Sequence, residues 1–77
     1  MSSYTINGVI YTMKRRGLED SRSGWRSRIT PFTSMLTIEY FPGEKIQITL
    51  IDKSILYITV EDEREKLHLK ELYRELC

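Results

Sequence analysis

Three short segments of alternating apolar and polar residues constrain the fold of this chain more than any other feature. Residues 35–41 (MLTIEYF) and 45–51 (KIQITLI) place an apolar side chain at every second position, which is the period of a strand with one buried face. Residues 55–60 (ILYITV) are more apolar. The breaks at 42–44 and 52–54 carry Pro-Gly and Asp-Lys-Ser, and connections this short join antiparallel neighbours. The sequence therefore predicts a three-stranded antiparallel meander.

The alternation also predicts which side chains share a face. In the first strand Leu36, Ile38 and Tyr40 fall on one face, opposite Met35 and Phe41. Apolar residues on the outer face would form a patch, made by Phe41, Ile51, Ile55 and Tyr57. Such a patch is either a surface for a second copy or another partner, or it is covered by an N-terminal strand.

The period changes to that of a helix after residue 60. Apolar residues recur at helical spacing, at Leu69, Leu72, Tyr73 and Leu76. The acidic run 61–65 would lie in the first turn, where the helix dipole favours negative charge, and Asp62 with Glu65 has the spacing of a capping box. A short strand over 66–69, followed by a helix of two turns, is the alternative. We favour the longer helix.

The N-terminal part contains further strand-forming residues and a long basic segment. Residues 4–13 favour at least one strand, over 9–13, and Asn7-Gly8 fits either a hairpin turn or a bulge. Residues 17–34 have few large apolar side chains and read as a long loop. We therefore predict one small α+β domain over residues 1–77: an antiparallel sheet of about four or five strands with one C-terminal helix packed on one face.

The composition excludes several features that commonly stabilise a small domain. Cys77 is the sole cysteine and His68 the sole histidine, so neither an internal disulfide nor a four-ligand zinc site is expected, and no cofactor is predicted. A homodimer is a possible support. No apolar run approaches the roughly 20 residues that span a bilayer, and the N-terminus lacks the order of a signal peptide. A cytoplasmic protein without membrane contact is the expectation.

The uneven distribution of charge along the chain is the feature that indicates a function. The segment 14–28 holds six of the twelve Lys and Arg residues but two carboxylates, whereas the chain from Pro31 onward has six basic and nine acidic residues. Arginine matches phosphate oxygens with paired hydrogen bonds, and an aromatic ring can stack on an unpaired base. We therefore predict binding of RNA or single-stranded DNA by a small regulator. The predicted site residues are Lys14, Arg15, Arg16, Arg22, Trp25, Arg26 and Arg28.

Other interpretations of the basic segment stay open. It could dock on an acidic partner protein, as an inhibitor or adaptor of a virus or mobile element would, or an exposed strand edge could pair with that partner. It could also keep the chain soluble, or pair with the acidic helix of the same or a neighbouring chain. No catalytic residues are predicted, because His68 has no nucleophile near it in sequence and the glycines do not form a phosphate-binding loop. The chain is therefore not expected to be an enzyme.

The segments 43–60 and 66–76 resemble part of the carbon storage regulator family, which consists of dimeric RNA-binding proteins. The matching positions are His68, Glu71, Leu72 and Tyr73. In that family paired strands lead to a short strand and then to a helix. The chain departs from the family at Leu69, where the family has an RNA-contacting arginine, and in its additional N-terminal residues.

Overall fold

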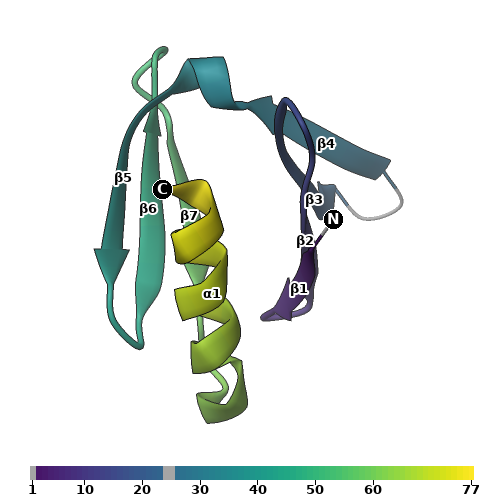
Figure 1. Cartoon of the computed structure of the whole chain (residues 1–77), viewed down its shortest axis with the longest axis vertical. Coiled ribbons are helices and arrows are strands. Elements are labelled where there is room, and N and C mark those ends of the chain that lie inside the picture. The colour runs from purple at the N-terminus through teal and green to yellow at the C-terminus, as the bar shows by residue number, and fades with distance from the viewer. Residues whose placement is uncertain (1, 24–25) are drawn as a thin grey trace.

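The computed structural model describes residues 2–23 and 26–77 of the chain. These residues form seven strands, two short 3₁₀-helices and one α-helix (Figure 1). In chain order they are β1 (Ser3–Ile6), β2 (Val9–Met13), β3 (Gly17–Ser23), β4 (Arg26–Pro31), η1 (Phe32–Ser34), β5 (Met35–Phe41), β6 (Lys45–Leu50), β7 (Ile55–Thr59), η2 (Glu63–Glu65) and α1 (Lys66–Leu76).

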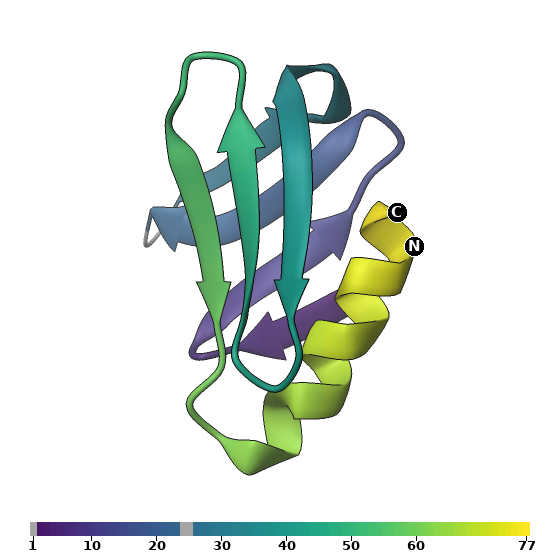
Figure 2. The same cartoon turned by 90° about the vertical axis from the view of Figure 1, so that its left-hand side faces the viewer.

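The strands form two antiparallel sheets that face each other. One has the order β1-β2-β3-β4 and the other β5-β6-β7, and the strands of the first run obliquely across those of the second (Figure 2). The α+β class and the meander of residues 35–60 are confirmed, but one sheet of four or five strands is wrong. An 11-residue helix cannot cover one face of seven strands, whereas two sheets cover each other.

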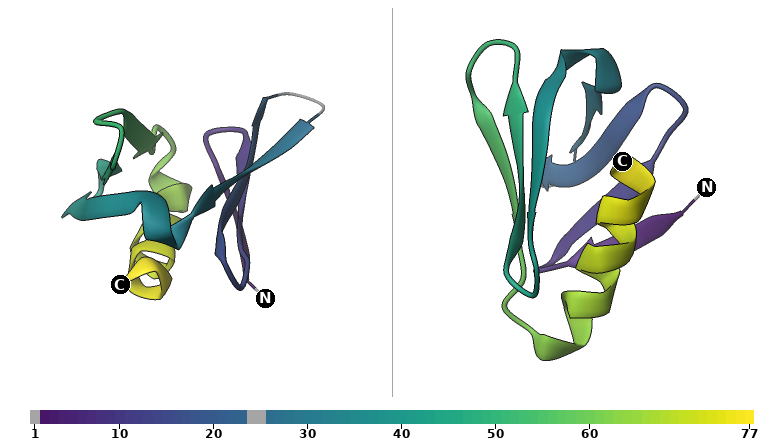
Figure 3. Two further views of the ribbon diagram at one scale, coloured as in Figure 1. Left: turned by 90° about the horizontal axis from the view of Figure 1, so that it is seen from above. Right: turned by 60° about the vertical axis from the view of Figure 1, so that its left-hand side comes forward.

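Proline separates the two sheets at the end of β4. Pro31 ends the strand, and Phe32 to Ser34 form the single turn η1. Proline has no N–H to donate to a continuing ladder, so it favours a change of direction here. Figure 3 shows the chain leaving β4, turning through η1 and entering β5 of the other sheet.

The predicted loop over residues 17–34 is wrong, because most of it forms β3, β4 and η1. The β3–β4 ladder pairs Leu18 with Thr30 and Asp20 with Arg28, and its register shifts between Asp20 and Ser23. The ladder is made by backbone hydrogen bonds, which do not require apolar side chains. Polar residues on both strands therefore concealed the hairpin from a search for apolar alternation.

A β-bulge changes the face assignment in β5. Met35 pairs with Leu50 but Thr37 pairs with Thr49, so one extra residue, Leu36, stands in β5. The extra residue shifts the phase of the alternation by one. As a result Met35 packs on the core with Ile38, while Leu36 is 61% exposed instead of sharing the face of Ile38.

The turn residues act as predicted. Asn7 and Gly8 both have positive φ, 52° and 78°, and connect β1 to β2 as a hairpin. Two successive positive φ values are the signature of the two-residue hairpin turn that Asn-Gly favours. The Asn7-Gly8 pair is therefore a hairpin turn and not a bulge.

The C-terminal helix is confirmed, and a strand over residues 66–69 is wrong, since α1 begins at Lys66. The acidic run 61–65 does not lie in the first turn of α1, where the sequence predicted it, but precedes the helix in and around η2. The structure also differs from the short strand that the carbon storage regulator resemblance implied. Asp62 accepts a hydrogen bond from the backbone N–H of Arg64, at 2.9 Å, and so caps η2. Glu65 does not complete a capping box, because its carboxylate accepts the backbone N–H of Asn7 in the β1–β2 turn, at 2.8 Å.

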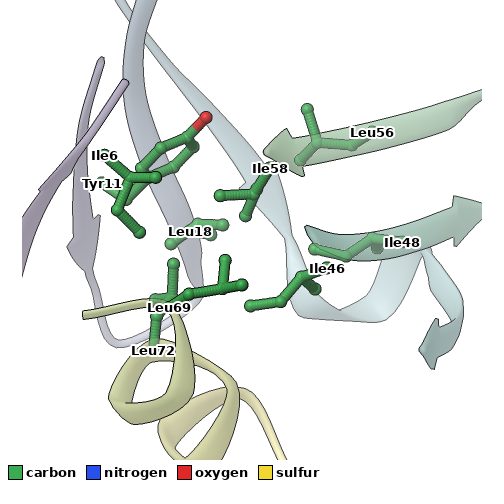
Figure 4. Packing of buried hydrophobic residues seen from close by; sticks show 9 residues of the cluster. All are labelled: Ile6, Tyr11, Leu18, Ile46, Ile48, Leu56, Ile58, Leu69 and Leu72. Atoms are coloured by element: carbon green, nitrogen blue, oxygen red, sulfur yellow. The ribbon is translucent and has the colours of Figure 1, made fainter. Parts of the chain in front are cut away.

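The core lies between the two sheets and α1 (Figure 4). Leu69 and Leu72 of α1 are fully buried, as predicted, and Tyr73 stacks on Tyr40 with ring centres 4.6 Å apart. The buried apolar side chains come from both sheets and the helix: Ile6, Tyr11, Leu18, Ile46, Ile48, Leu56, Ile58, Leu69 and Leu72. In the described part of the chain, no helix has the length and apolar character needed to cross a membrane.

Candidate docking surface

Strand β4 is an edge of the four-stranded sheet. In the described residues it pairs with β3 and with no other strand. The N–H of Phe32, just beyond β4, donates to the carbonyl of Arg16 at 2.9 Å, which fixes the alternation of the ladder. Residues at every second position then bond to β3, and those between them direct their N–H and C=O outward. By this alternation Thr30 and Arg28 bond to β3, and the backbone of Ile29 faces outward.

The side chains of β4 also alternate, between the two faces of the sheet. Thr30 is opposite Leu18 in the ladder, and both are buried, so Thr30 and Arg28 belong to the inner face. Ile29 and Pro31 belong to the outer face, where Ile29 is 52% exposed. The edge of β4 is therefore bordered by an arginine on one side and by apolar side chains on the other.

A hollow lies on each side of this edge. The outer one, of about 630 Å³, is lined by Arg15, Arg16, Ile29, Pro31, Phe32 and Thr33. The inner one, of about 460 Å³, lies between β4 and the β6–β7 turn and includes Arg28 and Asp52. Ile29 and Pro31 line both hollows, so β4 runs between them.

The basic residues predicted to form the site differ in their location and in their ion pairing. Arg15 and Arg16 form the turn between β2 and β3, which is closed by a hydrogen bond from the N–H of Lys14 to the carbonyl of Gly17, at 2.9 Å. Lys14 forms an ion pair with Glu19, with the amino nitrogen 3.8 Å from the carboxylate oxygen. The predicted loop cation at Lys14 thus already has an acidic neighbour.

Three arginines combine exposure with the absence of an ion pair. Arg15, Arg16 and Arg28 are exposed, and within residues 2–23 and 26–77 none forms a salt bridge. Arg26 is exposed at the start of β4, and Arg22 has its backbone in β3. Trp25, the predicted stacking residue, lies outside the described residues.

We define the arginine surface as the set of exposed residues that borders the edge of β4. It consists of Arg15, Arg16, Arg28, Ile29 and Pro31. Sequence reasoning found the arginines but missed Ile29 and Pro31. The sequence Ile-Thr-Pro after Arg28 indicated an edge or a strand end, since proline in a strand is confined to these positions.

The acidic run 61–65 lies at the opposite end of the molecule from the arginine surface. The start of α1 is at one end of the long axis, while η1 and the β2–β3 turn are at the other (Figure 1). The acidic residues Glu61, Asp62, Glu63 and Glu65 border a shallow hollow beside the β1–β2 turn. This separation excludes pairing of the arginine surface with the acidic helix start of its own chain.

Two of these carboxylates have cationic neighbours. Asp62 pairs with Arg64, at 3.0 Å, and Glu63 pairs with Lys66, at 2.8 Å. Hydrogen bonds from the side chain and backbone of Arg64 hold the pKa of the Asp62 carboxyl below its usual range. Across the described residues no group of His, Cys, Asp or Glu side chains has the arrangement of a metal site. The acidic run is thus a capped and ion-paired helix start.

The predicted apolar patch and His68 are the other candidate sites, and they lie apart from the arginine surface. Ile55 and Tyr57 are 41% and 43% exposed on the three-stranded sheet, and the four-stranded sheet lies against its other face. The N-terminal strand therefore does not cover the predicted patch. Ile51, 62% exposed, lies instead in the β6–β7 turn and lines the inner hollow beside β4. His68 is exposed on α1, with its Nδ1 3.4 Å from the carbonyl oxygen of Thr5.

Searches with this chain against protein-family models, curated proteins and solved structures gave no match. Function is therefore argued from the arginine surface itself.

Proposed function

We propose that this chain is a non-enzymatic binding module that docks on an acidic partner protein through the arginine surface. One observation carries the proposal: within residues 2–23 and 26–77, Arg15, Arg16 and Arg28 are exposed without ion pairs and lie beside exposed apolar residues along the free edge of β4. Arginine next to apolar side chains is the composition typical of protein–protein interfaces. A binding module of this kind would act as an inhibitor or adaptor.

The mixed character of the surface favours a protein over a nucleic acid. Nucleic-acid interfaces are more polar and more positively charged than protein interfaces. Here Asp52 borders the same hollow as Arg28, and Glu19, which pairs with Lys14, is the ladder partner of Ile29. A nucleic acid carries a phosphate at every nucleotide and would meet these carboxylates. A protein can place its own carboxylates opposite the arginines alone.

RNA or single-stranded DNA is the second candidate. It is supported by Arg15 and Arg16, two consecutive exposed arginines on one turn that could contact successive phosphates. Half-buried Phe32 at the floor of the outer hollow offers one aromatic ring beside them.

The test compares two variants with the same change in net charge. Arg15→Glu/Arg16→Glu reverses the charge of the arginine surface, and Lys70→Glu/Arg74→Glu reverses two exposed cations of α1 as a matched control. Each tagged protein is used to capture partners from nuclease-treated lysate of the source organism. We expect one protein to be retained by the wild type and the control, lost with Arg15→Glu/Arg16→Glu, and bound again when that protein is purified and mixed with the chain.

Fluorescence anisotropy with labelled single-stranded RNA and DNA at physiological salt decides between the candidates. Binding that Arg15→Glu/Arg16→Glu abolishes and the control retains, without any protein captured in the first experiment, would establish the nucleic-acid candidate and overturn the proposal. Equal capture by both charge variants would also overturn it, because the arginine surface would then not be the contact.

A further inference from the structure

We infer that the partner contributes an extended acidic segment, which adds to the edge of β4 as a fifth strand of the four-stranded sheet. The inference rests on the proposed function and specifies how the arginine surface is used. Three observations meet at β4: the outward-facing backbone, a hollow on each side of it, and arginines that form no ion pair in the described part of the chain.

The backbone supplies the first requirement of strand addition. Main-chain hydrogen bonds provide the affinity when an extended peptide joins a sheet edge. Because the N–H of Phe32 bonds to the carbonyl of Arg16, the N–H and C=O of Ile29 fall on the outer side of the ladder. The C=O of Pro31 accepts the Ser34 hydroxyl, at 2.8 Å, so the open stretch lies before Pro31.

The two hollows supply places for alternate side chains. Successive residues of an added strand point to opposite faces. On the inner side a side chain would meet Arg28, and on the outer side its neighbour would meet Ile29 with Arg15 and Arg16. An alternation of carboxylates and apolar residues matches this order.

The same arginines disfavour pairing of two copies through β4. Two β4 strands side by side would bring guanidinium groups of like charge together, and like charges opposite each other destabilise a sheet. An acidic strand would instead place carboxylates opposite these guanidinium groups. Charge thus disfavours the pairing of two β4 edges and favours the pairing of β4 with an acidic segment.

The other edge of this sheet shows how an edge is closed within the chain. At β1 the carbonyl of Thr5 contacts His68 of α1, and in the adjoining β1–β2 turn the N–H of Asn7 donates to Glu65 of η2. The equivalent groups of Ile29 have no such helix beside them, because α1 lies along β1. An incoming strand would close β4 as α1 closes β1.

The experiment uses the full chain and two labelled peptides, one alternating Glu and Val and one alternating Lys and Val. We expect the acidic peptide to bind and the basic peptide not to bind. Ile29→Pro removes the outward N–H without removing a bond to β3, and proline is tolerated at an edge position of this kind. Ile29→Ala is the control, because it shortens the same side chain and keeps the N–H.

The expected result is that Ile29→Pro binds the acidic peptide about tenfold more weakly than Ile29→Ala, corresponding to roughly one lost backbone hydrogen bond. Circular dichroism checks that both variants are folded. In the wild type, the acidic peptide should slow hydrogen exchange at the Ile29 amide, with the Thr30 amide, already bonded to β3, as the internal reference. The exchange measurement remains decisive if Ile29→Pro fails to fold.

The outcomes separate the inference from the proposed function. Equal binding by Ile29→Pro and Ile29→Ala, or an unchanged exchange rate at Ile29, overturns strand addition. If Arg15→Glu/Arg16→Glu still loses the captured protein in that case, the docking function survives. Failure of the acidic peptide to bind the wild type overturns strand addition as well.

Discussion

At Gly17 the backbone of β3 lies against β4 so closely that no side chain fits. A Cβ at this position would overlap the carbonyl of Thr30, with 2.9 Å to its carbon and 3.0 Å to the Ile29 methyl group. The obstructing atoms belong mostly to the backbone, so the two strands themselves would have to separate. Gly17 therefore fixes the closest approach within the hairpin that carries the arginine surface.

We expect Gly17→Ala to lower the free energy of unfolding by about 1–3 kcal/mol, since inserting atoms into a filled site forces the backbone apart. Urea denaturation followed by circular dichroism measures the change. Thr5→Ala, at an exposed position of β1, is the control and should cost no more than about 0.5 kcal/mol. An unchanged denaturation midpoint for Gly17→Ala would contradict this account of the β3–β4 contact.

Asp52 offers a second test at the scale of single residues. Its carboxylate accepts the hydroxyl of Ser54, at 2.5 Å, and the backbone N–H of Ser54, at 2.9 Å, and these bonds hold the pKa of the Asp52 carboxyl below its usual range. Because the folded pKa is depressed, the stabilisation is present above the unfolded pKa and is lost as the pH falls through the folded pKa.

We expect Ser54→Ala to raise the pKa of Asp52 toward its ordinary value, since the hydroxyl bond is removed and the backbone bond remains. A pH titration of the Asp52 carboxyl by NMR measures the midpoint. Thr33→Ala, at an exposed position of η1, should leave the midpoint where it is in the wild type. The same midpoint in all three proteins would contradict the role of the Ser54 hydroxyl.

At the scale of elements, α1 holds the two sheets together through two fully buried leucines. Leu72→Asp would place a carboxylate among apolar side chains, at a cost on the order of several kcal/mol, which a domain of this size cannot absorb. We expect Leu72→Asp to be unfolded at neutral pH. Circular dichroism and thermal melting check this.

Leu67→Asp is the matched control on the same helix, because Leu67 is 60% exposed. We expect it to fold with a melting temperature close to that of the wild type. A folded Leu72→Asp protein with an unchanged melting temperature would show that α1 does not need this contact.

The elements that the sequence predicted well are those with apolar alternation. Residues 35–60 and the helix carried that pattern, and their ends fell within a few residues of the observed ones. In β3 and β4 the pattern is interrupted by Asp20 and Arg28 on the inner face, so the strands were missed. The arginines of the site were visible in the sequence, whereas the edge position of β4 depends on pairing between strands, which composition does not encode.

At the scale of the whole molecule, the exposed patch of the three-stranded sheet stays a predicted contact between two copies. Light scattering over a range of concentrations measures the mass, and a dimer would give twice the 9.2 kDa of the chain. We expect Ile55→Lys to return such a dimer to the single-chain mass, because it places a charge in the patch. A mass of one chain at every concentration would contradict the homodimer.

The arginine surface and the acidic run 61–65 lie toward opposite ends of the folded chain, although its formal net charge is only +1. Under the proposed docking, the field of an acidic partner would attract the end with η1 and β4 and turn it toward the partner before the two surfaces touch. The requirement that two specific surfaces meet in the correct orientation limits the association rate of most protein pairs. We therefore expect the association rate with such a partner to fall as added salt screens the field.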